Sequence, residues 1–263
     1  MIIDLKDRVF LLTGVANKKS VATAVGELLV AAGAKIILSV QKAEQVGVAE
    51  KLFPHCEVLV CDVEKEREIE QLVTTMKEKN LKLDGLLHSL AYANYSEGVK
   101  PFHETKTEDF LQACQISCFS LTRLSAALKP FFHPSASVVT ISISNTLATN
   151  YGYLGPIKGM LELSCAYLAK SFSFDSQVRF NAVKAGPLKT SASAGIPGYL
   201  ENYLYAEKLT LRKKNLLTSE VAQTVLFLLS PLSSGINGTS LVVDAGMAVN
   251  TFEEEVVKTV TRL

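Results

Sequence analysis

Two side chains capable of proton chemistry, Tyr151 and Lys158, stand seven residues apart in the sequence. In a helix, seven residues are close to two turns, so both side chains would project from one face. An ammonium beside a phenol stabilises the phenolate and lowers the cost of releasing the tyrosine proton. The pair predicts a lysine-assisted proton donor. On spacing alone, an interfacial tyrosine and a solvated lysine are commoner, so the prediction depends on the rest of the chain.

The composition excludes several classes of protein. The 263 residues are 48% apolar and carry a net charge of +1, which gives no general attraction to nucleic acid or an anionic membrane. The first residues do not resemble a signal peptide, and no apolar stretch approaches the length of a membrane span. Five cysteines without C-x-x-C pairing indicate reduced thiols, and no metal site is predicted. We expect a globular cytoplasmic protein.

Short apolar runs alternate with helical patterns along the chain. The predicted strands are residues 8–13, 35–40, 57–61, 83–89, 137–142, 178–183 and 240–244. The predicted helices are residues 20–32, 42–53, 64–80, 107–132, 151–172 and 218–229. This alternation is typical of crossover units and predicts an α/β, Rossmann-type doubly wound parallel sheet. No repeat or linker is apparent, so residues 1–263 are interpreted as a single domain.

The first predicted strand ends in a candidate phosphate-binding turn. Gly14 permits a tight turn, and Ser20 can cap the next helix and hydrogen-bond a phosphate. Phosphates bind at helix N-termini beyond the carboxyl ends of parallel strands. The turn has one glycine where G-x-G-x-x-G has three, so an ordinary strand-to-helix turn explains the motif equally well.

Several short motifs follow one another in a characteristic order. They are Thr13-Gly-Val-Ala with Ser20-Val-Ala, Cys61-Asp62-Val63, Asp84-Gly-Leu-Leu-His-Ser-Leu-Ala91, Asn150-Tyr151-x6-Lys158, Asn181-Ala-Val-Lys-Ala-Gly-Pro187-x-x-Thr190 and Val243-Asp-Ala-Gly246. In this order they resemble the short-chain dehydrogenases/reductases. More narrowly, the single-glycine turn and the His88-Ser89 sequence resemble the bacterial enoyl-acyl-carrier-protein reductase branch. The resemblance spans about residues 1–250, and only the tail lies outside it.

The resemblance implies a nicotinamide cofactor and a set of residues around it. The implied pyrophosphate contacts are Gly14, Val15, Ser20 and Val21, with Gln41 beside the adenosine ribose. The implied contacts for the adenine and the middle of the cofactor are Asp62, Val63, Ser89, Leu90 and Ala91. The implied nicotinamide-side contacts are Lys158 on the ribose, with Gly186, Pro187, Leu188 and Thr190. Simpler roles remain open, since Asp62 could cap a helix and Ser89 could end a strand.

The residues after the second predicted strand bear on the choice of cofactor. An acid there would repel a 2′-phosphate and favour NADH, but the chain offers Gln41 and Lys42 instead. Lys42 could attract the 2′-phosphate of NADPH or begin a solvated helix. The resemblance to family members with glutamine at this place favours NADH, with NADPH as the alternative.

The implied reaction is the reduction of a trans-2-enoyl thioester, bound to acyl-carrier protein or CoA, in fatty-acid synthesis. Tyr151 would hydrogen-bond the thioester oxygen as it gains charge, and Lys158 would hold positive charge nearby. Residues 191–217 are expected to form a substrate lid, with residues 251–263 as a short tail. The residues expected to contact the acyl chain are Tyr153, Ala194, Ile196, Tyr199 and Tyr203. A basic cluster, Lys208 with Arg212, Lys213 and Lys214, would meet an acidic carrier protein or be solvated.

Two departures from the family pattern leave alternatives open. Ile143 follows Ser142 where relatives carry a tyrosine, and Pro156 must fall in the first turn of its helix to be harmless. Tyr153 is either a substitute for the missing phenol or a core tyrosine. A 3-ketoacyl or other carbonyl reductase would use Ser142 or Ser144, and a degenerate paralogue would bind nucleotide without turnover.

The two helices predicted over residues 107–132 and 151–172 carry more small and apolar residues than one face of a sheet requires. Relatives pair such helices across subunits, so the resemblance implies a homotetramer.

Overall fold

A seven-stranded parallel sheet forms the centre of the computed structural model, which describes residues 3–147 and 149–262. The strand order is β3-β2-β1-β4-β5-β6-β7. The strands are β1 (Val9–Thr13), β2 (Lys35–Val40), β3 (Glu57–Val60), β4 (Leu83–His88), β5 (Phe132–Ile143), β6 (Arg179–Ala185) and β7 (Ser240–Val243). The order reverses between β1 and β4, which opens the crevice where doubly wound sheets bind ligands. The predicted Rossmann-type fold is confirmed.

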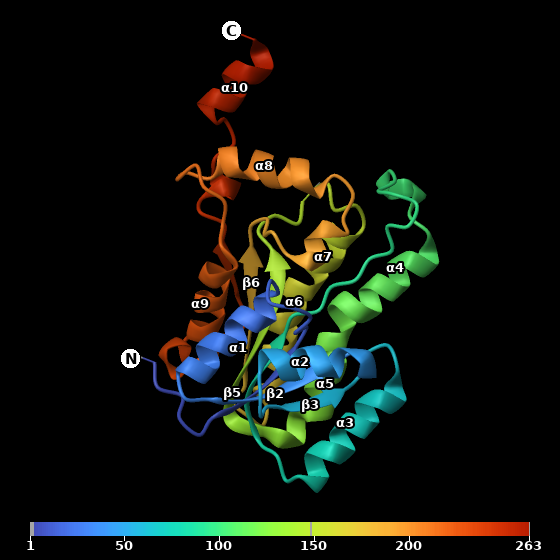
Figure 1. Ribbon diagram of the computed structural model, residues 1–263, viewed down its shortest axis with the longest axis vertical. Coiled ribbons are helices and arrows are strands. Elements are labelled where there is room, and N and C mark those ends of the chain that lie inside the picture. The colour runs from blue at the N-terminus through green and yellow to red at the C-terminus, as the bar shows by residue number, and fades with distance from the viewer. Residues whose placement is uncertain (1–2, 148, 263) are drawn as a thin grey trace.

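Helices cover both faces of the sheet (Figure 1). The α-helices are α1 (Val21–Ala31), α2 (Val46–Leu52), α3 (Glu66–Glu78), α4 (Thr107–Cys114), α5 (Ser120–Leu128), α6 (Leu154–Phe172), α7 (Ser191–Ala194), α8 (Tyr199–Leu209), α9 (Thr218–Leu229) and α10 (Glu254–Thr261). Short 3₁₀ turns are η1 (Ala43–Gln45), η2 (Phe102–Glu104), η4 (Lys129–Phe131), η5 (Pro231–Ser233) and η6 (Met247–Val249), and η3 (Gln115–Phe119) is a π-helical turn.

The side chains of β1 alternate between the two faces of the sheet, and both faces are buried. Leu11 packs into an apolar cluster with α3, α5 and α6, while Phe10 and Leu12 pack into a second cluster with α1 and α9. Successive side chains of a strand point to opposite faces, so a continuous apolar run requires cover on both.

The helix predicted over residues 107–132 is corrected by the structure. The π-helical turn η3 separates α4 from α5, and β5 begins at Phe132, which pairs with Leu83. A π turn accommodates an extra residue and re-aims the side chains around it. Here the Ser117 hydroxyl accepts a hydrogen bond from Tyr92 N at 2.7 Å and donates one to Tyr92 O at 2.9 Å.

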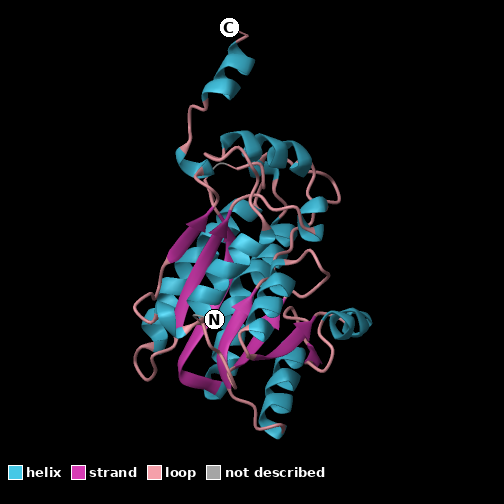
Figure 2. Cartoon of the chain, turned by 60° about the vertical axis from the view of Figure 1, so that its left-hand side comes forward, coloured by secondary structure: helices cyan, strands magenta, loops and turns pink. Residues whose placement is uncertain are grey.

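The lid and the tail lie at one end of the sheet. Helices α7 and α8 lie beyond the carboxyl ends of the strands, and α10 projects away from the body of the molecule (Figures 1 and 2). Gly198, at φ +69°, makes the turn between α7 and α8. Within residues 3–147 and 149–262, no helix is both long enough and apolar enough to cross a membrane.

His88 joins three elements at the end of β4. Its ring is fully buried, with Nδ1 2.8 Å from the Thr140 hydroxyl on β5 and Nε2 2.8 Å from the Ser120 hydroxyl on α5. Burial, followed by the nearby Lys158 charge, lowers the pKa of His88 to about 3. The ring is therefore neutral in the folded protein at any ordinary pH.

This depressed pKa predicts a pH dependence of stability. Between about pH 6.5 and pH 3, the unfolded chain binds a proton at His88 that the folded chain does not, so acid favours unfolding. The free energy of unfolding should fall by up to about 1.4 kcal/mol per pH unit through this group. Denaturant unfolding at several pH values measures the slope. His88→Gln should flatten it, and the exposed His133→Gln should not. Equal slopes for His88→Gln and the unchanged chain would contradict this assignment.

Candidate active site

The turn after β1 is shaped by Gly14. Its φ is +84°, and a Cβ there would stand 2.1 Å from the carbonyl oxygen of Ser89, so only glycine fits. Thr13 also joins the end of β1 to the end of β4. Its hydroxyl donates to Leu87 O and accepts from Ser89 N, each at 3.1 Å. Ser20 caps α1 by accepting from Thr23 N at 3.3 Å.

This turn therefore presents a helix N-terminus at the crevice between β1 and β4. Backbone N–H groups at such a terminus attract phosphate. Val15 and Val21 are buried in the apolar cluster on the α1 face, and Ser89 and Leu90 are half-buried with Ala91 exposed. The donors and the geometry of these segments fit a dinucleotide pyrophosphate.

Lys158 is a buried cation at the same edge of the sheet. The residue is 5% exposed, and its Nζ donates to Leu90 O at 3.2 Å and to Ile141 O at 2.9 Å. Burial lowers the pKa of Lys158 to about 8, opposed by Cys118 and by the Glu162 carboxylate. The ammonium is thus charged at neutral pH, and it is held by carbonyl oxygens rather than by a counter-ion.

Tyr151 lies in the turn before α6, which begins at Leu154. The prediction that Tyr151 and Lys158 share a helix face is therefore wrong. Gly152, at φ +55°, and the late start of α6 explain why, and Pro156 falls in the first turn of that helix as predicted. Burial raises the pKa of Tyr151, and the phenol of Tyr199 raises it further. The expected lowering of the phenol's pKa is contradicted in this conformation.

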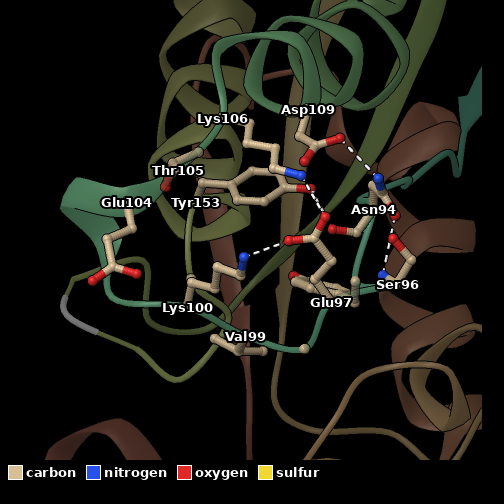
Figure 3. Close-up of a pocket in the computed structure, with 13 residues that line it drawn as sticks. Asn94, Ser96, Glu97, Val99, Lys100, Glu104, Thr105, Lys106, Asp109 and Tyr153 are labelled. Atoms are coloured by element: carbon tan, nitrogen blue, oxygen red, sulfur yellow. Dashed lines mark hydrogen bonds and ion pairs between the residues drawn. The ribbon is translucent and has the colours of Figure 1, made fainter.

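Two tyrosines fix the turn that carries Tyr151. The Tyr95 hydroxyl donates to Tyr151 O at 2.9 Å, and the Tyr153 hydroxyl donates to Asn94 O at 3.0 Å. Their ring centroids are 6.0 Å apart. Figure 3 shows the Tyr153 ring directed between Asn94 and Glu97 of the loop after β4. Sequence reasoning missed Tyr95, because its partner lies 56 residues away in the chain.

The packing of Tyr153 bears on the two interpretations of this residue. The residue is 8% exposed and its ring stands 6.5 Å from that of Phe110. Its hydroxyl donates to the Asn94 carbonyl, and the residue lines the pocket drawn in Figure 3. The alternative interpretation, a core tyrosine, matches the structure.

Ser142, one candidate for a carbonyl reductase serine, is not available for catalysis. It is buried, and its hydroxyl donates to Glu162 Oε1 at 2.5 Å. The other Glu162 oxygen pairs with Lys184 Nζ at 2.9 Å. Ser144 is also buried, at the end of β5.

The loop after β3 uses Asp62 as a cap. The Asp62 carboxylate accepts from Glu64 N at 3.1 Å and lies 3.3 Å from Lys65 Nζ, and both Asp62 and Val63 are buried. The simpler capping role of Asp62 is thus present in the structure. Gln41 and Lys42 are both exposed at the end of β2, where they flank the crevice.

The lid is tied to the loop after β6 through Tyr199. Its hydroxyl accepts from Leu188 N at 2.8 Å and donates to Leu188 O at 2.7 Å, and its ring meets that of Tyr151 edge-on at 6.2 Å. Gly186 packs against Asp244, where a Cβ would stand 3.0 Å from the Asp244 Cβ. The other predicted residues are placed as follows: Thr190 caps α7, Pro187, Ile196 and Tyr203 are half-buried, and Ala194 is exposed.

The predicted basic cluster is partly neutralised. Arg212 pairs with Glu220, and Lys213 pairs with Glu253 at the start of α10. Two of the four cations therefore have a carboxylate partner within the chain.

Comparisons with known proteins agree with this geometry. A family model described as "Enoyl-(Acyl carrier protein) reductase" matches residues 14–248. The chain is 34% identical to the enoyl-[acyl-carrier-protein] reductase [NADH] FabI of a Nostoc species, over 91% of this chain and 95% of that protein. It is 32% identical to the [NADPH] FabI of Staphylococcus aureus, over 93% and 98% of the two chains.

Solved structures give the same result. The crystal structure of FabI from Candidatus Liberibacter asiaticus superposes with a TM-score of 0.90 at 27% identity, covering 96% of this chain and all of that one. The family model spans the first turn, Tyr151, Lys158 and the lid together. The chain therefore belongs to the enoyl-(acyl carrier protein) reductase family of short-chain dehydrogenases/reductases.

Proposed function

We propose that this protein is an NADH-dependent reductase of trans-2-enoyl thioesters in fatty-acid synthesis, acting on substrates bound to acyl-carrier protein or CoA. The observation that carries the proposal is the Lys158 ammonium, fixed by carbonyl oxygens at the crevice that Gly14 and Ser89 shape. Relatives at about a third identity over nine tenths of the chain carry the same activity in their names.

In the proposed mechanism, NADH supplies the hydride that reduces the β-carbon of the substrate. Lys158 binds the nicotinamide ribose and keeps a positive charge close to the reacting atoms. Tyr151 donates a hydrogen bond to the thioester oxygen, on which negative charge collects as the enolate forms. Its raised pKa keeps the phenol protonated, which a hydrogen-bond donor requires.

The lid must move for this chemistry to occur. Tyr199 stands against Tyr151 and raises the pKa of its phenol, so substrate entry requires the Tyr199 ring to move aside. We propose that residues 191–217 act as the lid of one catalytic domain spanning residues 1–263, with residues 251–263 as a tail. Ile196, Tyr199 and Tyr203 are the lid residues proposed to contact the acyl chain.

The proposed cofactor is NADH. Gln41 offers a neutral neighbour for the adenosine ribose, and the Nostoc relative, like others with this activity, is named as NADH-dependent. The Staphylococcus aureus relative is named as NADPH-dependent, and the exposed Lys42 is the residue here that would favour a 2′-phosphate.

The proposed assembly is a homotetramer. Helix α6 exposes Leu163 and Tyr167, which are 66% and 76% accessible, and Phe119 of η3 is also exposed. Such apolar side chains on neighbouring helices support pairing across subunits. The five free cysteines suit the reducing cytoplasm, which we propose as the compartment.

The proposed reaction predicts a substrate preference. The purified chain should oxidise NADH with a crotonyl thioester and should not do so with an acetoacetyl thioester, because the Ser142 hydroxyl is held by Glu162. Absorbance at the NADH band follows both reactions. Turnover of the acetoacetyl thioester alone would identify a carbonyl reductase instead. NADH binding without turnover of either thioester would identify a non-catalytic paralogue.

The two tyrosines of the α6 turn should respond differently to loss of their hydroxyls. Tyr151→Phe should lower kcat about a hundredfold or more while leaving the Kd for NADH unchanged, because it removes a donor aimed at developing charge. Tyr153→Phe should lower stability by about 1 kcal/mol through its Asn94 hydrogen bond and keep most of the turnover. Steady-state kinetics and denaturant unfolding measure both. A larger loss of kcat in Tyr153→Phe than in Tyr151→Phe would reverse the assignment.

A further inference from the structure

The loop after β3, residues 61–65, is held by side chains from two neighbouring elements. Helix α3 supplies Glu68, whose Oε2 accepts from Asp62 N at 2.7 Å. The other side of the loop faces the α4–η3–α5 segment, from which Gln115 and Arg123 bind the backbone and Gln112 binds the Glu64 side chain. All three reach across to residues 48 to 60 positions earlier in the chain.

Arg123 and Gln115 bind two successive carbonyl groups of the loop. Arg123 Nη1 donates to Val63 O at 2.9 Å, and Gln115 Nε2 donates to Glu64 O at 2.9 Å. The Arg123 side chain is only 15% exposed, while that of its ion-pair partner Glu66 is 73% exposed. A pair with so exposed a carboxylate contributes little by itself, so the sheltered bond to the Val63 carbonyl is the stronger reason for an arginine here.

Together with hydrogen bonds inside the loop, these two bonds orient three consecutive peptide groups. The group between Val63 and Glu64 is fixed from both sides, by Arg123 on its carbonyl and by the Asp62 carboxylate on its N–H. The group between Glu64 and Lys65 is fixed by Gln115 on its carbonyl and by Asp62 O, which accepts from Lys65 N at 2.9 Å. That last bond also fixes the group between Asp62 and Val63.

The consequence is a defined direction for the Val63 N–H. In a trans peptide the carbonyl and the N–H point opposite ways, so an Asp62 carbonyl turned towards Lys65 directs the Val63 N–H away from it. Within the part of the chain that the structure describes, this N–H has no hydrogen-bond partner. It is a donor at the carboxyl end of β3, and doubly wound sheets bind dinucleotides outside the carboxyl ends of their strands.

We propose that Arg123 and Gln115 are positioning residues, which hold the backbone of residues 62–65 so that it binds the adenine of the cofactor. The proposal rests on the proposed function only in placing an adenine nucleotide at this loop. Neither side chain touches the cofactor. Each acts through a carbonyl group, and the expected effect of losing either is a loss of affinity for the adenosine half alone.

The test is calorimetric titration of the full-length chain with NADH, with ADP and with reduced nicotinamide mononucleotide, which lacks the adenosine. Arg123→Met keeps the buried stem and removes the donors, and it should raise the Kd for NADH and ADP about tenfold, which is about 1.4 kcal/mol. The Kd for reduced nicotinamide mononucleotide should stay within about twofold. Gln115→Met should act in the same direction.

Three further variants separate positioning from a general structural role. Arg123→Lys, which can still donate to the Val63 carbonyl, should recover most of the affinity. Glu66→Gln, which removes only the exposed partner, should bind like the unchanged chain. The matched control is Arg67→Met on the exposed face of α3, which makes the same change of charge and should also leave binding unchanged.

Equal weakening of all three ligands in Arg123→Met would overturn the proposal, because it would indicate general damage to the fold. Unchanged affinity for ADP in both Arg123→Met and Gln115→Met would overturn it too. The titrations need no turnover. A chain that binds NADH but reduces no enoyl thioester would refute the proposed reaction and leave the positioning test valid.

Discussion

The arrangement of this active site depends on one buried cation. Removing an ammonium from water costs several kcal/mol, and among residues 3–147 and 149–262 no carboxylate forms an ion pair with Lys158 to offset it. The carbonyl oxygens of Leu90 and Ile141 offset it instead, each bond to a charged donor contributing about 1.5–3 kcal/mol. The segment after β4, the end of β5 and helix α6 must therefore converge at one point.

This constraint explains the neighbouring polar groups. His88 stays neutral because it is buried and lies close to the same positive charge, and its ring joins β4 to β5 and α5 through two hydroxyls. Glu162, one turn beyond Lys158 on α6, raises the lysine's pKa but is occupied by Ser142 and Lys184. The carbonyl oxygens of Leu90 and Ile141, and not the Glu162 carboxylate, therefore bind the Lys158 ammonium. A ribose hydroxyl or a developing enolate is the kind of group that such a charge attracts.

Tyr151 is positioned by a different set of contacts. Ile143 follows the serine of β5 in this chain, and the tyrosines nearest to Tyr151 come from other segments. The Tyr95 hydroxyl of the loop after β4 donates to Tyr151 O, and the Tyr153 hydroxyl donates back to Asn94 O of that loop. Together these bonds fix the backbone of Tyr151. The side chain is then covered by Tyr199 of the lid. Hydrogen bonds thus hold the backbone of Tyr151, while a ring of the lid covers its side chain.

Much of this could be predicted from local sequence. Apolar runs of five to seven residues defined most strands, and the steric demand at Gly14 agreed with its place after the first strand. The helix-face argument for Tyr151 failed, because Gly152 adopts a left-handed conformation and α6 begins only at Leu154. Three features depend on partners far away in the chain: the π turn, the burial of Tyr153 and the hydrogen bond from Arg123 to the Val63 carbonyl. No periodicity reports such contacts.

The central claim is that hydride passes from the cofactor to the β-carbon of an enoyl thioester at this site. It is tested most directly with NADH deuterated at both C4 positions, a crotonyl thioester and mass spectrometry of the product. The account predicts a butyryl thioester that carries one deuterium, at C3, with the hydrogen added at C2 drawn from solvent. A butyryl product without deuterium, or deuterium found only in a hydroxyacyl product, would contradict it.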